Sequence, residues 1–285
     1  MKALIVGAAG QLGQSLVAAA PAEATILSAD RHTLDITDLD AVLSMMEQVR
    51  PDLIFNAAAY TAVDRAETEP DAAHAVNAQA VEHLASAARR AGASLIHVST
   101  DFVFDGAVGK PYAPTSATAP LGVYGRTKLV GEVAAGPDAL IVRTAWVYAP
   151  QGHNFVRTML RLMRERPEVR VVADQIGSPT YAPGLAAALW ALARRGARGI
   201  HHYTDAGACS WYDFAVAIQE EALASGLLSQ AVDIIPIATN DYPTPAARPH
   251  YSVLDKTSTF ELLGGSSPHW RTNLRKMMAE IKTHG

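Results

Sequence analysis

The stretch Lys2–Gln14, KALIVGAAGQLGQ, decides the fold of this chain. Its apolar run Ala3–Val6 is typical of a strand that is buried on both faces of a parallel sheet. Gly7, Gly10 and Gly13 follow with the spacing G-x-x-G-x-x-G and lead into a helical pattern. Such a turn brings unpaired N–H groups and the positive end of a helix dipole to one point. The stretch therefore predicts a site for the pyrophosphate of a dinucleotide.

The next segment supports this interpretation. Thr25–Ala29 has the pattern of a second strand and ends at Asp30. That position is near the distance, ~20 residues on, at which an acidic side chain meets a ribose 2′-hydroxyl. Arg31 stands beside it and could pair instead with a 2′-phosphate. We therefore expect both NADH and NADPH to serve as cofactor, with modest discrimination between them.

Composition indicates a globular protein of one large domain or two modest ones. The chain has 285 residues, of which 49% are hydrophobic and 18% charged. A formal net charge of −4 without a basic stripe argues against a nucleic-acid partner. No apolar run approaches the ~18 residues of a membrane span, and the first strand leaves no room for a signal peptide. With one cysteine, Cys209, and no metal-ligand motif around it, we expect a cytoplasmic protein without a metal site.

Strand and helix patterns alternate over the first hundred or so residues, which predicts an α/β fold with a Rossmann-like, doubly wound parallel sheet. The further strands are expected at Leu53–Phe55, Ser94–Val98 and Ala139–Thr144, and two of the helices at Thr37–Met46 and Asp71–Ala91. We expect residues 1–150 to form the NAD(P)-binding domain and residues 151–285 mainly a smaller substrate-binding region. Residues 169–205 are expected to return to the first domain.

Small and polar residues follow the predicted strands at the edge where ligands of such sheets bind. Ala57–Ala59 would let a cofactor approach the backbone closely, although tight packing alone also explains them. Ser99, Thr100 and Asp101 follow the fourth strand, and Trp146 comes just after the fifth.

Tyr124 and Lys128 are four residues apart on a predicted helix, so both side chains lie on one face. A tyrosine with its ordinary pKa near ~10 is a poor proton shuttle at neutral pH. A lysine ammonium about 4 Å away would favour the phenolate by roughly 4 kcal/mol, or about 3 pKa units. The Thr100 hydroxyl could bond to the same oxygen and hold a substrate carbonyl. We predict Tyr124, Lys128 and Thr100 as catalytic residues, the alternative being an aromatic helix cap and a solvated lysine.

Motifs along nearly the whole chain resemble the extended short-chain dehydrogenase/reductases and, more narrowly, the dTDP-4-dehydrorhamnose reductase family. The glycine and Tyr-x-x-x-Lys motifs are typical of the superfamily, whereas STDFVFDG and DQIGSPTYA are much narrower. The matching stretches are Gly7–Gly13, Leu34–Asp38, Asn56–Glu67, Ser99–Gly106, Tyr124–Glu132, Arg143–Tyr148, Asp174–Ala182 and Ala247–Asp255.

The resemblance implies that NAD(P)H reduces the C4 ketone of dTDP-4-dehydro-L-rhamnose to give dTDP-L-rhamnose. It implies that Tyr124 is the general acid and that Lys128 tunes it and holds the nicotinamide ribose. The implied substrate contacts are Thr100, Asp101 and Trp146. We add Arg248 as a candidate for the diphosphate, the alternative being a surface arginine beside two prolines. The expected cofactor-binding residues are Gly7, Gly10, Gln11, Leu12, Gly13, Asp30, Arg31, Asp35, Ile36, Ala58, Ala59, Tyr60, Thr61, Tyr124 and Lys128.

One departure from the family concerns its metal. Some relatives dimerise through Mg²⁺ that is bound partly by a Glu just after the glycine motif, where this chain has Gln14 and Ser15. A metal-linked dimer is therefore not expected, and the chain is predicted to be a monomer or a homodimer.

Two other functions stay open. A nucleotide-sugar dehydratase or epimerase would share the fold and the Tyr–Lys pair. A dehydratase usually follows its Thr with Asp-Glu, and here Phe102 takes the Glu position. A regulatory subunit like the methionine adenosyltransferase β subunit would need no catalytic set, and the presence of Thr100, Tyr124 and Lys128 together argues against it.

Overall fold

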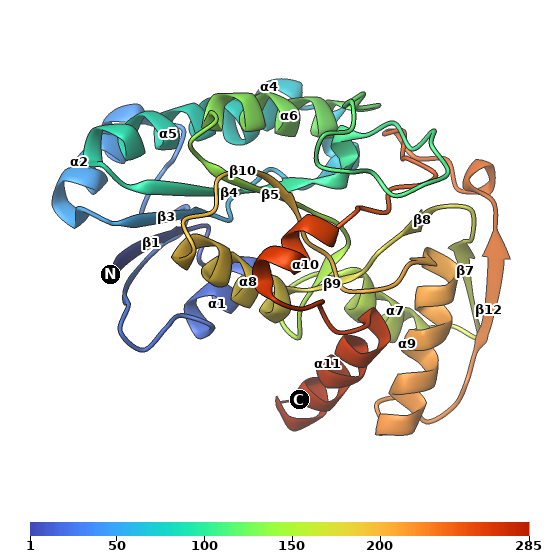
Figure 1. Cartoon of the computed structure of the whole chain (residues 1–285). Coiled ribbons are helices and arrows are strands. Elements are labelled where there is room, and N and C mark those ends of the chain that lie inside the picture. Colours follow the sequence, from blue (N-terminus) through green and yellow to red (C-terminus); the bar gives the residue numbers. More distant parts are fainter. Residues whose placement is uncertain (285) are drawn as a thin grey trace.

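A parallel sheet of six strands forms the centre of the molecule (Figure 1). The computed structural model describes residues 1–284. The strand order is β10-β5-β4-β3-β1-β2, and every neighbouring pair is parallel. The strands are β1 Lys2–Val6, β2 Thr25–Ala29, β3 Leu53–Asn56, β4 Ser94–Thr100, β5 Leu140–Thr144 and β10 Gly199–His202. The predicted Rossmann-like fold is confirmed, and the order reverses between β1 and β3, which is where such sheets bind ligands.

Helices cover both faces of this sheet (Figure 1). On one face lie α2 (Leu39–Val49), α5 (Ala80–Ala91) and α6 (Val123–Ala135), and on the other lie α1 (Gln11–Ala18) and α8 (Ala182–Arg194). Alternate residues of β1 enter separate cores. Leu4 and Val6 pack with residues of α2 and α5, whereas Ala3 and Ile5 pack with residues of α1 and α8. Burial on both faces explains the continuous apolar run in the sequence.

Two expected helices differ in detail from the structure. The predicted start of α2 at Thr37 is wrong by one residue, because the Asp38 carboxylate accepts the N–H groups of Asp40 and Ala41 and caps the helix. The helix expected over Asp71–Ala91 comprises α4 (Pro70–His74), a π-helical turn η1 (Ala75–Gln79) and α5. The short α3 (Val63–Ala66) precedes it.

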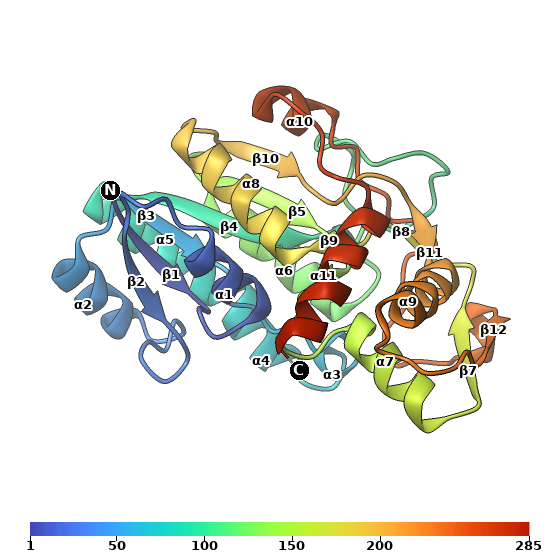
Figure 2. The ribbon, with the colours of Figure 1, turned by 90° about the horizontal axis from the view of Figure 1, so that it is seen from below.

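The second half packs around its own apolar core beside the sheet (Figure 2). Its main elements are α7 (Phe155–Glu165), β7 (Glu168–Val172), α9 (Trp211–Ser225), β12 (Asp233–Ile237) and α11 (Trp270–His284). The remaining short elements of the whole chain are η2 Asp101–Val103, β6 Val147–Tyr148, β8 Ile176–Gly177, β9 Thr180–Tyr181, β11 Cys209–Ser210, η3 Thr239–Asp241 and α10 Thr257–Leu263.

The predicted return of residues 169–205 to the first domain begins too early. α8 and β10 do join the central sheet layer, but β7 pairs along its whole length with β12 in a separate two-stranded sheet. Its partner strand lies over sixty residues further on, so the local pattern of β7 carries no sign of which sheet it joins.

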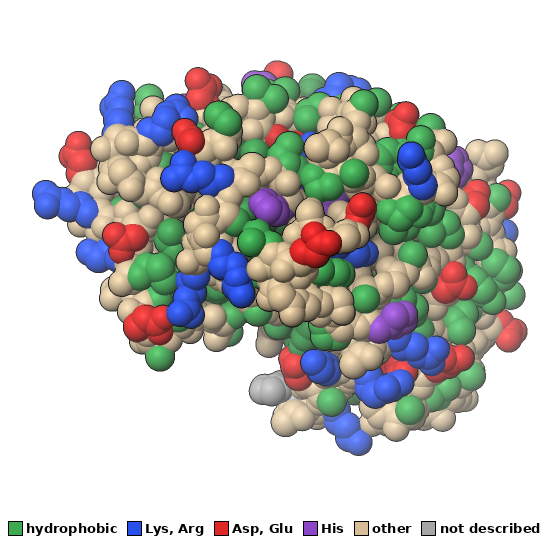
Figure 3. All heavy atoms as spheres, viewed as in Figure 1, with side chains coloured by type: hydrophobic (Ala, Val, Ile, Leu, Met, Phe, Trp, Pro, Cys, Tyr) green, Lys and Arg blue, Asp and Glu red, His purple; other side chains and the backbone are tan. Residues whose placement is uncertain are grey.

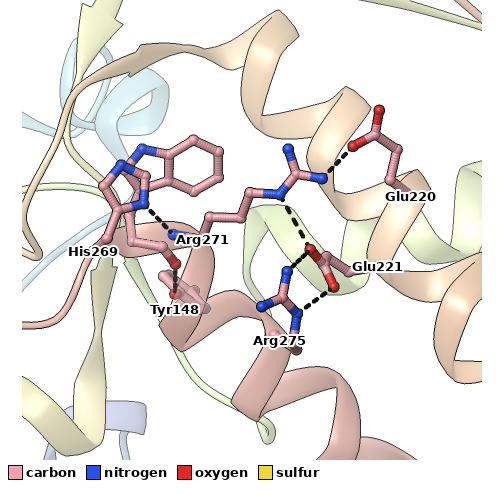
Figure 4. A network of polar contacts seen from close by, with 7 residues as sticks. Tyr148, Glu220, Glu221, His269, Arg271 and Arg275 are labelled. Atoms are coloured by element: carbon pink, nitrogen blue, oxygen red, sulfur yellow. Dashed lines mark hydrogen bonds and ion pairs between the residues drawn. The ribbon is translucent and has the colours of Figure 1, made fainter.

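Ion pairs fasten α11 to α9 (Figure 4). Arg271 contacts both Glu220 and Glu221, and Arg275 forms a two-pronged bond with Glu221 at 2.8 and 2.9 Å. The Tyr148 hydroxyl donates to the Trp270 carbonyl at 3.3 Å and ties the start of α11 to the strand that follows β5. The C-terminal helix is thereby an integral part of the second half.

The surface carries charges of both signs. On the face shown in Figure 3, Lys and Arg side chains are interspersed with Asp and Glu. Among residues 1–284, no helix combines the length and apolar character that a membrane crossing demands.

Candidate active site

Two cavities meet at the carboxyl ends of β1 and β3. One has a volume of about 690 Å³ and the other about 660 Å³, and both are lined by Ala9, Gly10 and Ala57–Ala59. Every predicted site residue except Gly13 lines at least one of them. The larger one, here called the catalytic cavity, holds Thr100, Tyr124 and Lys128, and the other, here called the cofactor cavity, holds Asp30–His32. Their joint extent suits a dinucleotide that crosses the sheet at its switch point.

The three glycines of the first turn serve different ends. Gly7 has a φ of +77°, and a Cβ there would come within 2.6 Å of the Ala58 nitrogen. A Cβ on Gly13 would come within 2.1 Å of the Gly7 carbonyl oxygen, so Gly13 lets α1 pack on the turn. Gly10 has neither a positive φ nor a severe steric clash, since a Cβ there would have one neighbour, the Gly7 oxygen at 3.3 Å. Gly10 lines both cavities. The absence of a side chain there keeps space open in the cavities and is not required by the packing of the turn.

The start of α1 is open to an anion. Its N-cap, Gly10, provides no side-chain hydrogen bond, and the first turn has no acidic residue. The Gln11 side chain points to the other half of the chain, donating to the His153 carbonyl at 3.1 Å and accepting from Asn154 at 2.8 Å. The predicted contact residue Gln11 therefore also ties the glycine turn to the loop after β6.

The cofactor cavity presents the Asp30 carboxylate next to the Arg31 guanidinium, with a second carboxylate, Asp35, further along its wall. The Asp30 carboxylate accepts the N–H groups of His32 and Thr33 at 2.9 and 3.0 Å, and these bonds lower its pKa. Arg31 has one contact in the part of the chain described, its neighbour His32 at 3.5 Å, and it forms no ion pair there. Asp35 accepts from the Thr37 hydroxyl at 2.7 Å. Both kinds of 2′ substituent, a hydroxyl and a phosphate, thus have a candidate partner.

The segment that follows β3 is held in place by buried amides. The Asn56 side chain accepts from the Ala58 N–H at 3.2 Å. The Asn77 side chain accepts from the Tyr60 N–H at 2.9 Å and donates to the Tyr60 carbonyl at 3.1 Å. Asn77 lies in the π-helical turn and also donates to Thr127 on α6 at 3.1 Å. The sequence analysis missed Asn77, because a π turn leaves no periodic signal and is seen only where the extra residue bulges.

Thr100, Tyr124 and Lys128 come together in the catalytic cavity as predicted. Lys128 is 2% exposed and donates to the Val98 carbonyl at 2.7 Å. Burial lowers its pKa to about 8, with Glu132 opposing the shift. Burial raises the pKa of Tyr124 to about 12, and a hydrogen bond with Thr100 opposes this shift. The pKa of Tyr124 therefore shifts in the direction opposite to the predicted one, because burial dominates it.

Comparisons with known proteins identify the family of the chain. The family described as "RmlD substrate binding domain" matches residues 1–283. The chain belongs to this family. It is 42% identical over 287 residues to the dTDP-4-dehydrorhamnose reductase of Aggregatibacter actinomycetemcomitans, covering 97% of this chain and 98% of that one. The predicted family resemblance is confirmed, and the chain is accordingly an oxidoreductase.

Solved structures of RmlD relatives superimpose over the full length. A dTDP-4-dehydrorhamnose reductase from Clostridium acetobutylicum gives a TM-score of 0.93 at 38% identity and covers 99% of this chain and 100% of its own. One from Bacillus anthracis, in complex with NADP, gives 0.92 at 37% identity and covers 98% and 99%.

The far wall of the catalytic cavity in this RmlD member is aromatic. Trp146 has a φ of +48°, a left-handed conformation that is costly for a bulky residue, and its ring stacks on Trp211 with centroids 3.5 Å apart. A Cβ on Gly177 would come within 2.6 Å of the Trp146 ring, so that glycine makes room for it. Trp211, the first residue of α9, was not among the predicted site residues.

Phe102 and Arg248 complete the wall. Phe102, at the position where a dehydratase has Glu, packs edge-on against the Tyr124 ring with centroids 5.5 Å apart. Arg248 lines the cavity, but it is paired with Asp64 through two bonds of 2.8 and 3.1 Å. Arg248 was predicted as a candidate for the diphosphate, whereas its partner Asp64 was not among the predicted site residues.

A buried ion pair lies behind the site. Glu132 of α6 forms a two-pronged bond with Arg143 of β5 at 2.7 and 2.8 Å, and both side chains are 3% exposed. Ser99 donates to the same carboxylate at 2.5 Å. This arrangement locks α6, which carries Tyr124 and Lys128, to the strand ends that form the cavity floor.

Proposed function

We propose that the chain reduces the C4 ketone of dTDP-4-dehydro-L-rhamnose to dTDP-L-rhamnose, with Tyr124 as the general acid. The observation that carries this proposal is the meeting of Thr100, Tyr124 and Lys128 in a cavity that is continuous with a dinucleotide-sized one. The names of the relatives supply the substrate.

Residues from both cavities would hold the nicotinamide cofactor. Gly10 and the start of α1 would receive the pyrophosphate, Asp30 or Arg31 the adenosine ribose, and Lys128 the nicotinamide ribose. The relative from Bacillus anthracis was solved with NADP, which supports a cofactor of this class. When bound, NAD(P)H supplies the hydride. We propose that both NADH and NADPH serve, because the carboxylate and the guanidinium stand together.

Tyr124 is suited to give a proton rather than to take one. A hydroxyl with a pKa of about 12 keeps its proton throughout the neutral range. The Thr100 hydroxyl beside it can share in binding the substrate oxygen, and Lys128, with a pKa of about 8, is mostly charged at pH 7. In the proposed complex, the Lys128 charge and the hydroxyls of Thr100 and Tyr124 would together stabilise the negative charge that develops on the carbonyl oxygen during its reduction.

The other wall of the cavity would receive the sugar and the diphosphate. Asp101 is 2% exposed, and burial raises its pKa to about 6, so it can accept a sugar hydroxyl when ionised. Trp146 would pack against the apolar face of the sugar, and Arg248 would face the diphosphate. Phe102 offers no carboxylate, which disfavours the dehydratase.

A turnover assay tests the proposal. The purified chain is supplied with dTDP-4-dehydro-L-rhamnose and NADPH or NADH, and loss of absorbance at the reduced nicotinamide band is followed together with the sugar product. We expect dTDP-L-rhamnose with either cofactor, with kcat/KM values that differ by less than about a thousandfold, or roughly 4 kcal/mol. Binding of both ligands without turnover would instead support the regulatory-subunit alternative.

A further inference from the structure

One short helical turn touches both the catalytic helix and the substrate side of the cleft. This turn is α3 (Val63–Ala66) together with Glu67, which follows it. Val63 lines the catalytic cavity, as does Thr61 two residues before it. Asp64 and Glu67 lie three residues apart, yet they bond to segments far away in the sequence. Neither carboxylate has a part in the function proposed above.

Glu67 caps the helix that carries Tyr124. Its Oε1 accepts the N–H of Val123, the first residue of α6, at 2.7 Å. The helix has no cap of its own, because its N-cap is Gly122 and its first turn has no acidic residue. A Cβ on Gly122 would come within 2.6 Å of the same Glu67 oxygen, so the glycine makes room for a cap from another element. The residue whose N–H is fixed directly precedes Tyr124.

Asp64 sets the plane of the Arg248 guanidinium. Its two oxygens accept from Nη1 at 3.1 Å and Nη2 at 2.8 Å, and Oδ1 also accepts the Ala246 N–H at 3.2 Å. Nη1 donates further to the Thr244 hydroxyl and the Ala246 carbonyl. The other edge of the guanidinium is formed by Nε and Nη2. Its Nε has no hydrogen-bond partner within residues 1–284. Such an edge matches two phosphate oxygens.

We propose that Asp64 and Glu67 are positioning residues for the reduction. Glu67 holds the N-terminus of α6 so that Tyr124 meets the reacting carbonyl, and Asp64 turns the free edge of Arg248 toward the diphosphate. Because both carboxylates belong to one turn, the proton donor and the diphosphate contact are placed relative to each other by α3. This inference rests on the proposed function for its substrate, but the hydrogen bonds that carry it do not.

The test compares variants that keep or remove the acceptor oxygen. Glu67→Gln keeps an oxygen that can accept from Val123, and Glu67→Ala removes it; Asp64→Asn and Asp64→Ala form the second pair. Glu82→Ala, an exposed carboxylate on α5 with no partner in the described part of the chain, is the matched control. The readouts are kcat and KM with the ketosugar, the Kd of dTDP by calorimetry, and amide hydrogen exchange at Val123 and Tyr124.

For Glu67→Ala we expect kcat to fall about 10-fold or more, the Kd of dTDP to stay within about twofold, and exchange at Val123 to speed up about 10-fold. Glu67→Gln should recover most of the loss. For Asp64→Ala we expect the Kd of dTDP to rise about 10-fold, with kcat at saturation within about threefold. Asp64→Asn should lie between Asp64→Ala and the unchanged chain.

Several outcomes would overturn the inference. They are an unchanged kcat and exchange rate in Glu67→Ala, an equal loss of kcat in Glu67→Gln and Glu67→Ala, or an unchanged Kd of dTDP in Asp64→Ala. If Glu67→Ala does not fold, Glu67→Gln decides, because a large loss of kcat or faster exchange at Val123 in a variant that keeps the acceptor oxygen would overturn the inference. If the unchanged chain has no turnover with the ketosugar, the proposed function fails, whereas the exchange and dTDP measurements still decide the positioning roles.

Discussion

Replacing Gly10 by Ala tests whether the glycine is needed for cofactor binding or for the stability of the fold. Gly10 has φ −76° and ψ 167°, an extended conformation that alanine adopts readily. The added methyl would meet the Gly7 oxygen at 3.3 Å, a contact that a shift of a few tenths of an ångström relieves. Loss of a glycine N-cap costs up to about 1 kcal/mol, and the reduced entropy of the unfolded chain returns about 0.4–1 kcal/mol. The free energy of unfolding should therefore change by less than about 1 kcal/mol.

Cofactor binding should respond much more strongly to the same methyl. It would stand in the wall shared by the two cavities, where a pyrophosphate has to approach the N–H groups of α1. Loss of one charge-assisted hydrogen bond, about 1.5–3 kcal/mol, raises the Kd of NADPH by about 10–100-fold.

Fluorescence titration with NADPH and thermal unfolding together provide the assay. The melting temperature of Gly10→Ala should fall by less than about 4 °C. Gly13→Ala is the contrast, because its Cβ would lie 2.1 Å from the Gly7 oxygen, and this variant should lose about 3 kcal/mol of stability or more. A Gly10→Ala variant that binds NADPH within twofold of the unchanged chain would refute the reasoning.

Three further predictions concern the surroundings of the site. Glu132→Ala should lower the free energy of unfolding by about 3–5 kcal/mol in denaturant titration, because Arg143 is left buried and unpaired, whereas Glu165→Ala, which breaks an exposed pair, should cost about 1 kcal/mol or less. Burial raises the pKa of Asp101 from 3.8 to about 6, so the folded state holds this proton more tightly and stability falls as pH rises through that window. Asp101→Asn removes that fall, and its stability relative to the unchanged chain should rise by about 2.4 kcal/mol between pH 4 and pH 7; a constant difference would contradict the shift. Arg248→Ala should raise KM for the sugar nucleotide by about 10–100-fold, and an unchanged KM would remove Arg248 from the site.

The local sequence accounts for the sheet and for most of the cleft. Buried parallel strands such as Lys2–Val6 appear as continuous apolar runs, and the glycine spacing marks the turn at the switch point. Once these elements alternate, the strand ends have to meet, so the proximity of Thr100, Tyr124 and Lys128 follows from the topology. That reasoning needs no knowledge of side-chain contacts.

The features that the sequence did not reveal depend on distance through space. The pKa of Tyr124 depends on its burial, and the bond from Lys128 to the Val98 carbonyl gives no mark in the sequence. Asp64 and Arg248 are 184 positions apart, and neither is unusual in its local context. The same holds for β7. It pairs with β12 rather than with the central sheet, and this pairing depends on contacts between segments far apart in the sequence. The π-helical turn at Asn77 is visible only once α4 and α5 are placed around it.

The central claim is that the Tyr124 hydroxyl gives its proton to the substrate oxygen, and Tyr124→Phe tests it most directly. The substitution keeps the ring and its edge-on contact with Phe102 and removes only the oxygen. With dTDP-4-dehydro-L-rhamnose and saturating NADPH, kcat should fall by about 10²–10⁴ while the Kd of NADPH stays within about twofold. Lys128→Met should differ by losing turnover and cofactor affinity together. A Tyr124→Phe variant with kcat within threefold of the unchanged chain would contradict the account.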